Sequence, residues 1–195
     1  MKDIFLKEIK EQNSVIRNCK DEKEISEGNK NLFATIDKIL HLSKTARHDG
    51  LLALEEEAMR LEGFPGGNYL KNMLMLIVEG TDGYLLDEIC GYKYFAEGLE
   101  GYQALAYIMM LEGCLAIQAG ENPFIIKARL LAMLSEKQSS AYEKNKKEEE
   151  AASQVLKLQK GAKASSDTKE KAKSGSNQGF LSAEEIRELL STVKK

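Results

Sequence analysis

Two segments of this sequence are apolar on nearly every side of a helix, and they restrict what the rest of the chain can form. They are residues 68–78 (NYLKNMLMLIV) and residues 102–119. A helix that is hydrophobic all round is normally buried in the middle of a bundle. A bilayer span needs roughly 20 apolar residues, whereas the longest apolar run here, residues 104–111, is broken by Glu112. We therefore predict a soluble, all-α protein: a compact helical bundle with no membrane span.

The composition fits such a bundle and argues against several functional classes. Apolar residues make up 43% and charged residues 30% of the chain, and a net charge of -3 gives no bulk reason to expect nucleic-acid binding. His41 and His48 lie about 10.5 Å apart along a helix, too far to chelate one metal ion. No phosphate loop, dinucleotide fingerprint or nucleophile elbow is present. We therefore expect no catalytic, metal or cofactor site, and interpret the 3 cysteines as reduced apolar residues of a cytoplasmic protein.

Changes of composition along the chain predict its organisation. Residues 1–30 form an N-terminal helix and connector, residues 31–137 the main helical domain, and residues 138–160 a charged helical extension. Residues 161–179 are rich in Gly, Ser, Lys and Ala and cannot bury enough apolar area to offset their ordering entropy. We predict that they form a disordered linker.

The last segment, residues 180–195, has the pattern of a short amphipathic helix. It opens with an S-x-x-E capping box and continues with apolar residues at helical spacing. Short amphipathic helices on flexible tethers are typically docking peptides. The predicted docking residues are Leu181, Ile186, Leu189 and Leu190.

A second pattern surrounds Gly50. If one helix runs through this glycine, Arg47, Leu51 and Glu55 fall at i, i+4 and i+8 and share one stripe of its surface. The two charges are then about 12 Å apart along the axis, too far to neutralise each other, so a partner helix with the opposite order of charges can bind the stripe. The alternative is that these are ordinary surface charges, as we expect for the solvated carboxylates of residues 55–57.

Three stretches of the chain resemble, in order, parts of flagellar stator A subunits, the MotA/PomA family. Residues 42–58 (LSKTARHDGLLALEEEA) are similar to the segment after the family's second transmembrane helix. Residues 74–89 (LMLIVEGTDGYLLDEI) are similar to its L-x-V-D-G-x-D-x-E-x-L stretch. Residues 110–134 (MLEGCLAIQAGENPFIIKARLLAML) are similar to the helix and turn after its fourth transmembrane helix. The turn motif of this last stretch is Gly120, Glu121, Asn122 and Pro123.

This resemblance implies the fold of the stator A-subunit cytoplasmic domain without its channel. In the family, an Arg and a Glu of the first stretch engage the torque helix of the rotor switch protein, and these roles fall on Arg47 and Glu55. The family's transmembrane helices and pore residues have no counterpart here, and Phe124 stands where a basic or polar residue is usual. The resemblance therefore implies a non-channel protein at the base of the flagellar motor that binds the rotor switch and influences motility and chemotaxis.

The tail carries a separate resemblance. Residues 181–190 (LSAEEIRELL) are similar to the peptide of FliM/FliY-type switch proteins that binds the phosphorylated chemotaxis response regulator, although Ala183 and Arg187 replace the usual Gln and Asp. This implies an adaptor that recruits a response regulator; the alternatives are a segment that folds back on the parent domain, or a helical scaffold with no motor role. The sequence leaves these alternatives and the stoichiometry open, a homo-oligomer included.

Overall fold

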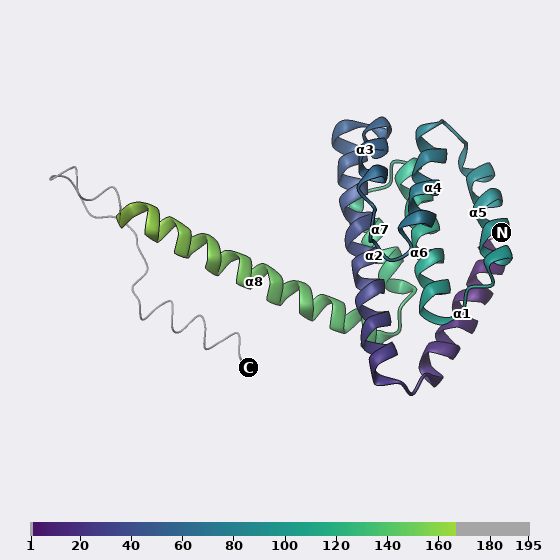
Figure 1. Ribbon diagram of the computed structural model, residues 1–195, viewed down its shortest axis with the longest axis horizontal. Coiled ribbons are helices and arrows are strands. Elements are labelled where there is room, and N and C mark those ends of the chain that lie inside the picture. The colour runs from purple at the N-terminus through teal and green to yellow at the C-terminus, as the bar shows by residue number, and fades with distance from the viewer. Residues whose placement is uncertain (1, 167–195) are drawn as a thin grey trace. The chain divides into compact units, whose positions relative to one another are not determined.

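Helix α6 (Gly101–Gln118) lies in the middle of the helical bundle, as Figure 1 shows. In this computed structural model, which describes the backbone of residues 2–166, almost every side chain from Ala104 to Ile117 is buried. Five other helices pack around α6 and supply the apolar surfaces that cover it. The prediction of an all-α bundle around residues 102–119 is confirmed.

The order of elements is helical throughout the described range, with no strand between residues 2 and 166. The elements are α1 (Lys2–Asn18), α2 (Glu22–Asp49), the 3-10 helix η1 (Leu51–Ala53), α3 (Leu54–Met59), α4 (Gly67–Val78), α5 (Gly83–Glu97), α6, α7 (Pro123–Ala132) and α8 (Glu136–Ser166). The chain divides into one unit of residues 1–139 and a second of residues 140–195. We predicted a linker from residue 161, whereas α8 continues to Ser166. No helix within residues 2–166 is long and apolar enough to cross a membrane.

Two glycines allow α2 and α6 to approach closely. A Cβ atom at Gly113 would lie 2.5 Å from the Cγ2 atom of Ile39, and one at Gly28 would lie 2.3 Å from the ring of Tyr102. Both distances are far below ordinary van der Waals contact, so the two helices could not hold this separation with alanine at either position. The contacts also show that α2 and α6 run in the same direction, so both end at the same end of the bundle.

Polar contacts attach α1 to the bundle. Glu8 Oε1 accepts hydrogen bonds from the Tyr94 hydroxyl at 2.8 Å and from Gln12 Nε2 at 2.9 Å. Gln12 Oε1 in turn accepts from the Gly101 N–H at 2.7 Å, at the start of α6. The ring of Phe5 is buried and packs edge-on against Tyr94. Helix α1 is therefore part of the same core as the main helices.

Residues 19–30, expected from their charged and polar composition to be a frayed helix end or a connector, are helical from Glu22 onward. The side chain of Asp21 caps α2 by accepting hydrogen bonds from the N–H groups of Lys23 and Glu24. Acidic residues in the first turn add a favourable interaction with the helix dipole. These local effects offset the low apolar content that suggested a connector.

Two helix starts have side-chain caps. Asp82 caps α5 and Asn122 caps α7, each through a side-chain oxygen that accepts from backbone N–H groups. The two turns are joined, because the Gln118 side-chain amide donates to the Thr81 carbonyl oxygen. The α4–α5 and α6–α7 turns therefore lie side by side, at the end of the bundle where α2 also ends.

Candidate functional site

The segment predicted to bind a partner forms a corner, not a straight helix. Helix α2 ends at Gly50, whose N–H donates to the Ala46 carbonyl oxygen at 3.0 Å and whose backbone has φ 88° and ψ 168°. This conformation is accessible to glycine and strained for other residues. The chain then forms η1 and α3, which pack back against α2 and α4. We call residues 47–59 the α2–α3 corner.

The corner corrects the predicted stripe of Arg47, Leu51 and Glu55. Spacings of i, i+4 and i+8 place side chains in one row only where the α-helical backbone is continuous, and here it is interrupted at Gly50. Arg47 lies in the last turn of α2, Leu51 opens η1, and Glu55 lies in the first turn of α3. The structure therefore places the two charges on different arms of the corner.

All three predicted residues are nevertheless exposed. Each charge also suits its own helix end, since a cation at a C-terminus and an anion at an N-terminus both interact favourably with the helix dipole. Such interactions contribute about 0.3–1 kcal/mol each at exposed positions. This local role accounts for the two charges without any partner, and is the alternative that a binding experiment must exclude.

A buried carboxylate holds the corner together. Glu57 is only 8% exposed. Its Oε2 atom lies 3.1 Å from His41 Nε2 and 3.9 Å from Lys38 Nζ, both on α2, and its Oε1 accepts from Arg60 Nη1 at 3.1 Å. Arg60 also pairs with Glu56. These contacts tie α3 to α2 across the break at Gly50.

This finding corrects the prediction that the carboxylates of residues 55–57 form one solvated face. Glu55 and Glu56 are exposed, but Glu57 follows Leu54 by three positions and so falls on the buried side of α3. The helical period places Glu57 on the same side of α3 as Leu54, so its burial could have been predicted from the sequence. Two of its partners, Lys38 and His41, lie on α2 and are distant in sequence, so the sequence pattern did not indicate them.

Apolar side chains occupy the outside of the corner. Leu52 is 73% exposed, Met59 58% and Leu51 36%. Exposed residues of both charges are close to them in sequence, including Arg47 and Glu55. An apolar centre with a charged rim is the usual anatomy of a protein interface.

The two histidines near the corner have separate partners. His41 contacts the Glu57 carboxylate, while His48 Nδ1 lies 2.6 Å from Asp49 Oδ1 at the exposed end of α2. The hydrogen bond with Asp49 raises the pKa of His48 above its ordinary value. In the part of the chain that the structure describes, no group of three or more His, Cys, Asp or Glu side chains is arranged to hold a metal ion.

The turn motif at residues 120–123 has a clear structural role. Gly120 has φ 69°, and its N–H donates to the Ile117 carbonyl oxygen at 3.0 Å. The Glu121 N–H donates to the Ala116 carbonyl at 3.0 Å, which completes a helix C-terminal motif of the Schellman type. Asn122 Oδ1 then accepts from the Phe124 N–H at 2.9 Å.

The side chain of Glu121 fixes this turn on α7. Its Oε1 atom accepts from Arg129 Nη2 at 2.8 Å, and Arg129 Nη1 lies 3.6 Å from Glu112 Oε2 on α6. With Pro123 at the first position of α7, the motif turns the chain sharply between two helices. The four motif residues therefore build the fold at the same end of the bundle as the corner.

The predicted docking residues of the tail, Leu181, Ile186, Leu189 and Leu190, lie outside the described residues. The sequence matches no protein-family model and no curated protein. Its resemblance to stator A subunits therefore remains a prediction based on the three stretches quoted above.

Proposed function

We propose that this chain is an interaction protein that docks on the flagellar rotor switch protein through the α2–α3 corner. The observation that supports the proposal is the construction of the corner. Buried Glu57 anchors α3 to α2, while Leu51, Leu52 and the charged side chains beside them face outward. A rigid support under an exposed apolar and charged surface lowers the ordering cost of binding.

The resemblance to stator A subunits supplies the identity of the partner. It assigns rotor contacts to Arg47 and Glu55, which are exposed on the two arms of the corner. A partner helix that crosses the corner would meet a cation on one arm and a carboxylate on the other, with Leu51 and Leu52 between them. In this proposal the apolar pair supplies affinity, and the two charges orient the partner and accelerate association.

The proposed role is docking without ion conduction. The chain would act as an accessory or regulator at the rotor, because the resemblance covers the family's cytoplasmic stretches and none of its pore residues.

Binding of charge-reversed variants to the purified switch protein tests this proposal. Arg47→Glu and Glu55→Lys should each weaken binding, because rim charges that face complementary groups become repulsive. The chain offers matched controls in Arg17, exposed in the last turn of α1, and Glu22, exposed in the first turn of α2. Arg17→Glu and Glu22→Lys change the same charges at equivalent helix ends and should leave binding unaltered.

The outcomes separate the hypotheses. Equal loss of binding in the control variants would show that the effect depends on net charge and not on the positions of Arg47 and Glu55. No binding by the unaltered protein would favour the helical-scaffold alternative.

A second candidate function rests on the tail sequence LSAEEIRELL. We propose that this segment recruits a phosphorylated response regulator, with Ile186, Leu189 and Leu190 as its apolar contacts. A peptide of residues 179–195 should then bind the phosphorylated regulator, and Leu189→Ala should remove most of the affinity. Binding of the peptide to a chain that ends before residue 161, with none to the regulator, would instead indicate that the tail folds back.

A further inference from the structure

Helix α5 carries a large apolar face that no other described element covers. Its buried side points into the bundle through Leu86, Cys90 and Tyr94. On its opposite side, large apolar residues are exposed at 39–77% of their surface. We call these residues the α5 face: Tyr84, Leu85, Ile89, Tyr92 and Phe95.

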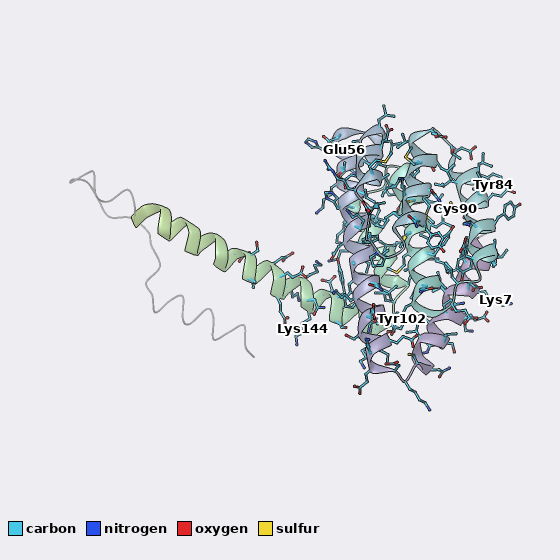
Figure 2. The ribbon with its side chains drawn as sticks, in the orientation of Figure 1. Lys7, Glu56, Tyr84, Cys90, Tyr102 and Lys144 are labelled. Atoms are coloured by element: carbon cyan, nitrogen blue, oxygen red, sulfur yellow. The ribbon has the colours of Figure 1, made fainter. Side chains whose placement is uncertain are left out.

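The five residues of the α5 face form one continuous stripe on the helix surface. At about 100° per residue its five members fall within an arc of about 140°. Figure 2 shows Tyr84 on the outer side of the bundle and Cys90 nearer its interior. Glu88 is the charged residue within this arc, and its Oε1 atom accepts a hydrogen bond from the Tyr92 hydroxyl at 2.7 Å. The face is therefore apolar along most of α5, with its one charge already hydrogen-bonded.

The exposed area is large enough for a specific interface. Tyr84, Tyr92 and Phe95 are 77%, 66% and 52% exposed. Since aromatic side chains bury about 150–250 Å² each, these three present roughly 300–500 Å². A standard interface buries about 800 Å² per partner, slightly more than half of it apolar. The α5 face supplies most of that apolar core.

We infer that the α5 face binds a second copy of this chain, with the two α5 helices antiparallel about a two-fold axis. The two halves of the face differ, because the N-terminal half holds aliphatic Leu85 and Ile89 beside Tyr84, whereas the C-terminal half holds aromatic Tyr92 and Phe95. Antiparallel pairing places Leu85 and Ile89 of each copy against Tyr92 and Phe95 of the other. A surface that complements itself in this way suits the isologous interface of a two-fold dimer.

Two further features fit a second copy. A hollow of about 460 Å³ lies beside the face, between α4 and α5, and its lining includes Met73, Leu76, Ile89 and Ala96. In the antiparallel arrangement Leu85 of one copy lies level with Ala96 of the other, at this hollow. Antiparallel α5 helices also align their dipoles favourably. The face offers no strong charge pattern that would select an unlike partner.

Analytical ultracentrifugation of the full chain tests the inference. Between about 1 and 100 μM the protein should change from monomer to dimer. Tyr92→Glu and Leu85→Glu should each raise the dimer dissociation constant about tenfold or more, because each places a charge inside an apolar interface. Phe124→Glu is the matched control, since Phe124 is 74% exposed but lies on α7. Circular dichroism confirms that each variant is folded.

The pairing direction is tested by disulfide formation in a Cys19→Ser background. Chains with Leu85→Cys mixed with chains with Ala96→Cys should cross-link, and Leu85→Cys alone should not.

A wild-type protein that is monomeric at the highest concentration overturns the inference, as does a Phe124→Glu variant whose dimer is weakened as much as that of Tyr92→Glu. Cross-linking of Leu85→Cys alone overturns the antiparallel arrangement. Because α5 lies outside the α2–α3 corner, Tyr92→Glu should keep its affinity for the rotor switch protein, so this inference and the proposed function can fail separately.

Discussion

Replacing Glu57 by Gln tests the contact that shapes the α2–α3 corner. The change keeps the size of the side chain but removes the charge that faces His41, Lys38 and Arg60. A buried hydrogen bond to a charged group contributes about 1.5–3 kcal/mol. His41 and Arg60 are more than half exposed and can be hydrated once the carboxylate is lost, which reduces the cost. We therefore expect Glu57→Gln to lower the free energy of unfolding by about 1–2 kcal/mol.

Urea unfolding followed by circular dichroism measures this loss, with Glu56→Gln as the control. Glu56 is adjacent, has the same chemistry and pairs with the same Arg60, but its side chain is 73% exposed. With a slope of about 2 kcal/mol per molar urea, Glu57→Gln should shift the midpoint by roughly 0.5–1 M. Glu56→Gln should change stability by less than about 0.5 kcal/mol. Equal effects of the two substitutions would refute the reasoning that buried Glu57 anchors α3.

Gly50→Ala should destabilise the chain by about 1–3 kcal/mol in the same assay, because a side chain is strained at φ 88° even though no atom lies within 4 Å of an added Cβ. An unchanged midpoint would contradict the positive φ at Gly50. Burial raises the pKa of the Cys90 thiol to about 11 and raises that of Cys114 as well, so neither should react with a thiol reagent near pH 8 until the chain unfolds. Rapid reaction of all 3 cysteines of the native protein would contradict their burial. NMR titration should give His48 a pKa above its ordinary value, and Asp49→Asn should lower it. Since the folded-state pKa of His48 is raised, the stabilisation from this pair is present in acid and is lost as the pH rises through that pKa. A His48 titration unaffected by Asp49→Asn would refute the pairing.

The features that were predictable from the sequence are those set by local chemistry or by strong periodicity. The apolar surface all around residues 102–119 required a central helix, and α6 is central. Asn122, and either Thr81 or Asp82, were identifiable as caps because a capping side chain bonds to N–H groups two or three residues ahead; the structure has Asp82 as the cap of α5. Such signals lie within one segment of chain and do not depend on distant neighbours.

The features that were not predicted depend on contacts between segments. A glycine inside an amphipathic pattern is compatible with a continuous helix, and the reversal at Gly50 is stabilised by Glu57 binding to α2. The local signal for a break was the basic last turn at Arg47 and His48 before a glycine, which is typical of a helix C-terminus. The exposure of the α5 face could not be predicted for a different reason. Apolar residues on both sides of a helix predict burial on both sides, and the bundle covers one.

The most direct test of the proposed docking is a charge exchange across the interface. The titration uses the double variant Arg47→Glu, Glu55→Lys and rotor switch proteins with reversed charges on their torque helix. The proposal predicts that the double variant binds the natural switch protein about tenfold or more weakly, and that a charge-reversed switch protein restores part of the affinity. The control pair Arg17→Glu, Glu22→Lys should show neither effect. Undiminished binding by the double variant would contradict the assignment of Arg47 and Glu55 as rotor contacts.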